Sequence, residues 1–200
     1  MATLVKNGVC CVAEGANMPT TLEAVDVLEA ATSALANLTS YSDHNCMKVL
    51  EHDGVSVMVR VVTQSYSENL LDLDQNDEVQ ANAAEMLANV SRFCVDDTAP
   101  YFSGKVIDTL VVMCASQNKQ LRRHIPLVLG NVGQLERCRQ EIGVKGGIEA
   151  LFLVLEDGDT TMQANTLWSL CNLMWHPPNQ ERAGRFMTEI LEFMESPWAP

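Results

Sequence analysis

The sequence predicts an all-α protein built as a helical solenoid, and three observations support this prediction. A string of leucine, a small residue, asparagine and an aliphatic residue occurs four times, at Asn37, Asn89, Asn131 and Asn172. A glycine that opens an aliphatic run follows each of the first three asparagines at a nearly constant distance. Between these markers, apolar residues recur at i, i+3, i+4 and i+7, which is the spacing of an amphipathic helix. Two markers in phase indicate repeated units that bury their apolar faces against their neighbours.

The repeat period is about 42 residues, which lies in the range of helical repeats. The interval from Asn89 to Asn131 nearly equals that from Asn131 to Asn172, whereas the interval from Asn37 to Asn89 is clearly longer. The long first interval contains a polar, acidic stretch between Val62 and Asp77 that lacks helical apolar spacing after its first residues. We therefore predict that an insertion forms a mobile acidic loop between these two residues.

The elements follow in order from these landmarks. We predict a leading helix, three repeats and a partial C-terminal cap, at residues 22–41, 43–92, 94–134, 136–175 and 178–195. Gly54, Gly104 and Gly147 are expected to form corners between helices, because glycine enters the left-handed conformation without a side-chain penalty. Pro126 lies inside the third long helix, where its missing N–H predicts a kink or a late helix start.

Composition and charge exclude several classes of protein. With 47% hydrophobic and 20% charged residues, the chain is neither a disordered tail nor a collagen-like fibre. Its 13 basic and 26 acidic residues leave a net charge of −13, which opposes attraction to phosphates and predicts no nucleic-acid partner. No apolar run reaches the roughly 18 residues of a membrane span, so no membrane insertion is expected. The stretch from Met1 to Glu14 makes a poor signal peptide, and we predict a cytoplasmic protein, with the nucleus as the alternative.

Residues with reactive side chains form no catalytic or metal site in the sequence. The seven cysteines are an odd set without a C-x-x-C pair, and we interpret them as reduced thiols of the core. His44, Cys46 and His52 lack the second pair of ligands that a zinc site needs. Cys171 and His176 have no acid at helical spacing to orient them as nucleophile and base. We therefore predict no enzyme activity, no metal and no cofactor.

The repeated motifs resemble those of the armadillo repeat family, over about residues 22–195. In that family the second helix opens with glycine and an aliphatic run, as Gly147–Leu155 does here. The third helix ends in A-x-x-L-x-N-L, and Ala34–Leu38 is close to this pattern. The resemblance implies a right-handed α-solenoid of armadillo-type repeats. It also implies that the third helices line a concave groove, in which the repeated asparagines hold the backbone of an extended peptide.

The resemblance thus predicts a non-enzymatic interaction module or scaffold that binds an extended or helical segment of another protein. An amide side chain offers a donor and an acceptor together, so it can satisfy both polar groups of a peptide unit. Residues one turn from each asparagine share its face of the helix, and tyrosine, tryptophan and arginine often anchor interfaces. The candidate groove residues are Asn37, Tyr41, Glu85, Asn89, Arg92, Arg123, Asn131, Asn165, Trp168, Asn172 and Trp175.

Several alternatives stay open from the residues alone. The asparagines have a second interpretation, in which they cap or hydrogen-bond the next helix within the solenoid. Trp168 and Trp175 have one too, as core residues. Some importins of the family place a tryptophan four residues before each asparagine, and only Trp168 reproduces that pair. A solvated face is favoured over a phosphate site for the one basic cluster, which consists of Arg122, Arg123, His124, Arg137 and Arg139.

The N-terminal residues, about the first 28, resemble a different family. Val12–Thr21 is similar to the segment of glutamate dehydrogenases in which a strand of the coenzyme domain ends beside the nicotinamide, and Asn17 takes the position near the cofactor. No G-x-G-x-x-G motif that would hold a pyrophosphate follows. We assign residues 1–20 to an irregular, dehydrogenase-like segment and residues 21–200 to the repeat domain. The alternative function is a dehydrogenase-derived fragment with residual nucleotide binding. Because the periodicity starts after this segment, it predicts that deleting the segment leaves thermal unfolding nearly unchanged.

Overall fold

The computed structural model describes residues 22–67 and 73–195, which are mainly helical and contain no strand. This confirms the all-α fold class. Four long helices contain the repeated asparagines: α2 (Leu22–Ser40), α5 (Leu73–Ser91), α7 (Lys119–Val132) and α10 (Thr160–Leu173). The shorter α-helices are α3 (Asp43–Glu51), α4 (Gly54–Ser67), α6 (Lys105–Met113), α8 (Glu136–Val144), α9 (Gly147–Asp157), α11 (Pro177–Ala183) and α12 (Met187–Glu195). Two short 3-10 helices are η1 (Ala99–Phe102) and η2 (Gly184–Phe186). None of the helices in the described ranges is long and apolar enough to cross a membrane.

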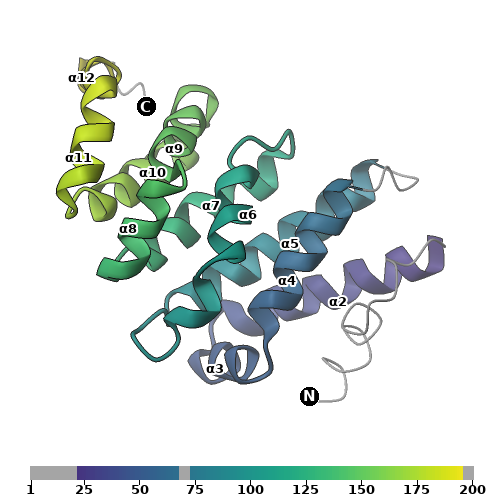
Figure 1. Ribbon diagram of the computed structural model, residues 1–200. Coiled ribbons are helices and arrows are strands. Elements are labelled where there is room, and N and C mark those ends of the chain that lie inside the picture. Colours follow the sequence, from purple (N-terminus) through teal and green to yellow (C-terminus); the bar gives the residue numbers. More distant parts are fainter. Residues whose placement is uncertain (1–21, 68–72, 196–200) are drawn as a thin grey trace.

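The four long helices form one layer of a solenoid. α2 packs on α5, α5 on α7 and α7 on α10, so the order along the chain is also the order in space (Figure 1). α4, α6 and α9 pack on the long helix of their own repeat and form the second layer. A single hydrophobic core extends between the layers from Leu28 to Ala183. Each repeat is therefore stabilised mainly by its neighbours, as the periodicity predicted.

The corner glycines have two different roles, and only one of the three has a positive φ. Gly104 has a φ of +61° directly before α6. In the other two repeats the residue with positive φ is the one before the predicted glycine, namely Asp53 and Gly146. Gly54 and Gly147 are instead the first residues of their helices, where a Cβ would lie 2.3 Å from a side-chain carbon of the preceding helix. Glycine is required at these two positions because the preceding helix packs too closely for a side chain, and not because the backbone has a positive φ.

The acidic loop predicted between Val62 and Asp77 is mostly helix. α4 continues to Ser67 and α5 begins at Leu73, and only residues 68–72 lie outside the described ranges. Both helices are longer than their equivalents in the next repeat. α4 has 14 residues and α6 has 9, while α5 has 19 residues and α7 has 14. The extra residues therefore lengthen both helices of the first repeat, because polar residues continue a helix wherever one of its faces is solvated.

Pro126 does not delay the start of α7. The helix begins two turns earlier, at Lys119, and the Asn118 side chain before it accepts a hydrogen bond from the Leu121 N–H at 3.0 Å. This N-cap supplies the start signal, so the predicted late start is wrong. The Pro126 carbonyl accepts a hydrogen bond from the Ser169 hydroxyl of α10 at 2.6 Å, which ties two neighbouring long helices together.

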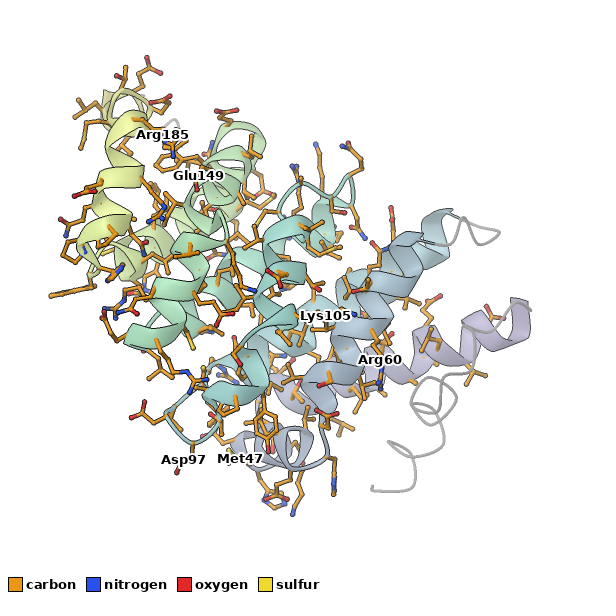
Figure 2. The ribbon with its side chains drawn as sticks, viewed as in Figure 1. Met47, Arg60, Asp97, Lys105, Glu149 and Arg185 are labelled. Atoms are coloured by element: carbon orange, nitrogen blue, oxygen red, sulfur yellow. The ribbon has the colours of Figure 1, made fainter. Side chains whose placement is uncertain are left out.

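The C-terminal elements cover the end of the third repeat. Phe186 of η2 stacks on Phe152 of α9, with ring centroids 4.1 Å apart and an interplanar angle of 14°. Beside this stack, Arg185 and Glu149 form an ion pair, and Figure 2 shows the two residues next to each other. α11 packs on α8 and α9. These contacts cover part of the apolar surface of the third repeat.

Candidate functional site

The repeated asparagines link each long helix to the one before it. The amide nitrogen of Asn89 lies 3.4 Å from the Ala36 carbonyl and 3.3 Å from the Thr39 hydroxyl of α2. The amide nitrogen of Asn131 donates to the Ser91 hydroxyl at 2.9 Å. Asn172 repeats this bond to α7, where its amide nitrogen donates to the carbonyl of Gly130 at 3.1 Å. The asparagines therefore do form hydrogen bonds within the solenoid, but to the preceding long helix and not to the next helix that the alternative interpretation named.

The same asparagines keep their amide oxygens open. Asn89, Asn131 and Asn172 are half-buried, and in the described part of the chain no group donates a hydrogen bond to any of the three oxygens. Asn37 of α2 is exposed. Since the nitrogen is held by the preceding helix, the amide plane is oriented, and its oxygen is presented at the surface as a fixed acceptor. In each of these asparagines, the amide nitrogen thus forms a hydrogen bond within the solenoid, and the amide oxygen remains available as an acceptor.

The two tryptophans are surface residues, so their interpretation as core residues is wrong. Trp168 of α10 is 42% exposed and Trp175, just after α10, is 74% exposed. The Trp168 ring lies across α7, where a Cβ on Gly130 would come within 2.6 Å of its Cζ3 atom. The glycine therefore makes room for the indole against the neighbouring helix. Tyr41, at the end of α2, is almost fully exposed.

The two candidate arginines already form contacts with other residues of the solenoid. Arg92 donates from Nε to the Asn89 carbonyl at 3.0 Å, and its guanidinium lies 5.9 Å from the centroid of the Phe93 ring. Arg123 of α7 pairs with Asp159 at 2.8 Å, which joins α7 to the start of α10. Both side chains remain accessible, and both are held in one orientation.

Asp159 has two roles, and its ionisation affects both. Its Oδ1 accepts a hydrogen bond from the Met162 N–H at 2.9 Å and so caps α10, while Oδ2 faces Arg123. The Arg123 guanidinium holds the pKa of this carboxyl below its usual value, and the hydrogen bond from the backbone of Met162 adds to the shift. Because folding lowers this pKa, the stabilisation is fully present above the unfolded pKa and is lost as the pH falls through the folded value.

Asp159→Ala is expected to lower the free energy of unfolding by about 1 kcal/mol, because the N-cap is lost. Asp159→Asn keeps an acceptor at the cap and loses only an exposed ion pair, which is worth about 0 to 1 kcal/mol. Urea unfolding at pH 7 measures both changes. Repeating it near pH 3 should reduce the difference between wild type and Asp159→Asn, and a constant difference would contradict the ion-pair role.

His124 is a residue of this surface that sequence analysis placed in the basic cluster instead. It lies two helical turns before Asn131, at the same offset by which Asn165 precedes Asn172. Both His124 and Asn165 are half-buried. Burial lowers the pKa of His124, and the carboxylate of Glu85 on α5 acts in the opposite direction. This common spacing from the repeated asparagine could have predicted that His124 lies on the same face as Asn131.

The predicted basic cluster is solvated only in part, since Arg137 is exposed and Arg123 is half-buried. Arg122 is buried. Arg139 donates to the carbonyls of Gly133 and Gln134 at 2.9 and 2.8 Å and pairs with Glu136 at 3.0 Å. Because these groups lie in and after the turn between α7 and α8, Arg139 stabilises that turn.

The cysteines and histidines do not assemble a metal centre in the ranges that the structure describes. Cys46, Cys94, Cys114 and Cys138 are buried free thiols, and burial raises the pKa of Cys114 to about 12. Cys171 is exposed, so its interpretation as a core residue is wrong. Cys10 and Cys11 lie outside the described residues. No group of three or more His, Cys, Asp or Glu side chains that could hold a metal ion occurs in residues 22–67 and 73–195.

Solved structures with the same arrangement of helices identify the fold. A designed armadillo repeat protein in complex with the peptide (KR)4 matches with a TM-score of 0.68 and 16% identity, over 98% of this chain and 83% of that one. The fold is that of the armadillo repeats. A second designed armadillo repeat protein matches with a TM-score of 0.62 and 17% identity, over 86% of this chain and 73% of that one. An engineered protein matches at 0.66 and 20% identity over 84% of this chain, which spans 62% of its length.

The N-terminal residues match a family model of glutamate/leucine/phenylalanine/valine dehydrogenases over residues 1–40. This agrees with the dehydrogenase-like segment that the sequence indicated. The matched residues include all of α2, so the family match overlaps the first long helix of the array. None of the curated proteins matches the chain.

Proposed function

We propose that this chain is a non-enzymatic armadillo-repeat scaffold that binds an extended segment of a partner protein along the face of α2, α5, α7 and α10. The observation that carries the proposal is the row of open amide oxygens at Asn89, Asn131 and Asn172. Each belongs to a neighbouring long helix, so the row offers one acceptor per repeat to the N–H groups of an extended backbone.

Exposed aromatic side chains on or directly after the long helices support the proposal. Trp168 lies one helical turn before Asn172, and Trp175 and Tyr41 follow the ends of α10 and α2; all three are exposed, and such residues often contribute most of the affinity of an interface. Trp168 is also supported by α7 through the gap at Gly130, so little conformational entropy is lost when a partner covers it. The likeness to a designed armadillo repeat protein in complex with a peptide is consistent with this use of the surface.

Asn131→Ala and Trp168→Ala are each expected to weaken peptide binding about 5- to 30-fold, corresponding to about 1 to 2 kcal/mol. The probe is an unstructured peptide selected from a displayed random library against the wild-type chain, with its affinity measured by fluorescence anisotropy. Trp168→Ala should cost less stability than the about 3 to 5 kcal/mol of a buried aromatic residue, because Trp168 is partly exposed.

Leu153→Ala is the matched control, because Leu153 is half exposed on α9, in the second layer of the solenoid. It should leave the affinity unchanged. Unchanged affinity in both Asn131→Ala and Trp168→Ala would show that the selected peptide binds elsewhere, and the assignment of this face would then fail whatever the effect on stability.

The dehydrogenase-family match to residues 1–40 favours one second candidate, which is residual nucleotide binding. A titration with NADH that follows its fluorescence tests it directly. Binding that Asn17→Ala abolishes would favour this candidate, and no change in fluorescence would exclude it.

A further inference from the structure

Two buried thiols meet at the boundary between the second and third repeats. Cys94 lies in the turn after α5, and Cys138 lies in α8. The Cys94 thiol donates a hydrogen bond to the sulfur of Cys138. Cys94 is 7% exposed and Cys138 is fully buried, and both are free thiols. Two sulfur atoms from different repeats are thus in contact without a covalent bond between them.

Hydrogen bonds hold the two segments together on both sides of this thiol pair. Before it, the amide nitrogen of Asn131 donates to the Ser91 hydroxyl at 2.9 Å. After it, the Gly104 N–H donates to Oε1 of Glu141 at 2.8 Å. In both segments the cysteine lies between these two bonds along the chain. The contact between the two sulfur atoms is therefore fixed by the packing of α8 on the segment after α5.

The other two buried thiols of the described residues donate to backbone carbonyls instead. Sγ of Cys46 donates to the Thr39 carbonyl at 3.2 Å. Sγ of Cys114 donates to the Leu110 carbonyl at 3.6 Å. These two thiols are as buried as the pair, so they serve as internal controls for any effect of burial alone.

We propose that Cys94 and Cys138 are a redox modification site, at which a peroxide forms a reversible disulfide between the second and third repeats. The disulfide would close a loop of about 45 residues, and a cross-link of this length restricts the unfolded chain strongly. The oxidised array is therefore more stable than the reduced one. The proposal is independent of peptide binding to the long helices.

The turn that contains Cys94 gives a small oxidant access to the pair. Residues 95–97 are exposed. The Thr98 hydroxyl closes this turn, because it donates to the Phe93 carbonyl at 2.6 Å and accepts from the Val95 N–H at 2.9 Å. Since these bonds are local, the turn can open without unfolding a long helix. Hydrogen peroxide is small enough to reach the sulfur atoms through such an opening.

The pair supplies both a nucleophile and a second thiol to complete the reaction. The hydrogen bond from Cys94 lowers the pKa of the Cys138 thiol, burial opposes this shift, and the guanidinium of Arg137 adds to it. The thiolate is the form of cysteine that reacts with oxidants. Cys138 is therefore the residue that reacts first.

The reaction balances with one peroxide for two thiols. The Cys138 thiolate attacks one peroxide oxygen, the O–O bond breaks, and the leaving hydroxide takes the proton of the Cys94 thiol and departs as water. Cys138 is now a sulfenic acid. The Cys94 thiolate attacks its sulfur, the S–S bond forms and the S–O bond breaks. The second hydroxide takes a proton from solvent, which replaces the one that Cys138 released on ionisation. The two sulfur atoms lose two electrons, and the peroxide gains them.

Peroxide treatment of the folded full chain tests the site directly. The background carries Cys10→Ser, Cys11→Ser and Cys171→Ser, which leaves the four buried thiols. After treatment with hydrogen peroxide, free thiols are blocked with iodoacetamide in denaturant, and the chain is digested without reduction for mass spectrometry. We expect a disulfide between Cys94 and Cys138 that dithiothreitol reverses, with the other two thiols alkylated. Recovery of the pair as free thiols or sulfinic acids, or oxidation of all four thiols at one rate, would overturn the proposal.

Thermal unfolding before and after oxidation supplies a second measurement. In the same background, oxidation should raise the midpoint by about 5 to 10 °C, and dithiothreitol should restore the original value. Cys138→Ala should abolish the rise, whereas Cys114→Ala, which removes an equally buried thiol, should keep it. Because each variant is compared with itself, the cost of the substitution does not enter. A rise in Cys138→Ala equal to that of the parent would also overturn the proposal.

Discussion

Phe152→Ala is expected to lower the free energy of unfolding by about 3 to 5 kcal/mol. The Phe152 side chain is fully buried in α9 and stacks on Phe186 of η2. Truncation removes this contact and leaves a cavity between the third repeat and the C-terminal cap. Urea unfolding followed by circular dichroism measures the loss.

The adjacent residue provides the control for this prediction. Leu153→Ala removes a half-exposed side chain from the same helix and should cost about 0.5 kcal/mol or less. In a double-mutant cycle with Phe186→Ala, the two aromatic residues should couple by about 0.5 to 1.5 kcal/mol. Equal losses for Phe152 and Leu153, or no coupling, would contradict the packing of the cap on α9.

Gly147→Ala is expected to cost about 1 to 3 kcal/mol, although alanine favours helices over glycine. A Cβ at this position would lie 2.3 Å from Cγ2 of Ile142 and 2.9 Å from its carbonyl oxygen. The backbone oxygen cannot move without shifting the end of α8, so the clash is not relieved by a change of rotamer. The loss should appear in thermal and urea unfolding alike.

Gly184→Ala is the matched control for the corner glycine. Gly184 has a φ of −58°, and apart from its own chain neighbours no atom lies within 4 Å of the position that a Cβ would take. Its replacement should change the free energy of unfolding by about 0.5 kcal/mol or less. Similar effects at both glycines would show that the close approach of α9 to α8 does not limit the residue at position 147.

The architecture could be predicted from local patterns because a solenoid is stabilised by contacts between neighbouring units. The spacing of Asn89, Asn131 and Asn172 and the apolar positions between them were sufficient to predict the long helices and their order. The predicted leading helix at residues 22–41 corresponds to α2 at Leu22–Ser40. Periodicity was less informative between Val62 and Asp77, since an acidic helix with one solvated face resembles a loop in composition.

The roles of individual side chains depended on atoms from other repeats. The sequence shows that Asn131 recurs with the period, but only the fold shows that its nitrogen is bound to Ser91 while its oxygen is open. Likewise, Trp168 is apolar enough for a core, but only the fold shows that it lies over Gly130 of the neighbouring helix with 42% of its surface exposed. The repeat spacing predicted which glycines form the corners. Why glycine is needed there depends on how closely the preceding helix approaches, which only the structure shows.

Two valines show where prediction from the sequence ends and where the tertiary structure decides. Val27 and Val79 are the same residue at the same position relative to their asparagines, and no local pattern distinguishes them. Val79 is 1% exposed and Val27 is 62% exposed. The periodic sequence determined that both face the same side of a long helix, because side-chain direction follows from position along the helix. Burial depends on what lies opposite, and α4 packs on α5, whereas α2 packs mainly on α5 and on the short helix α3.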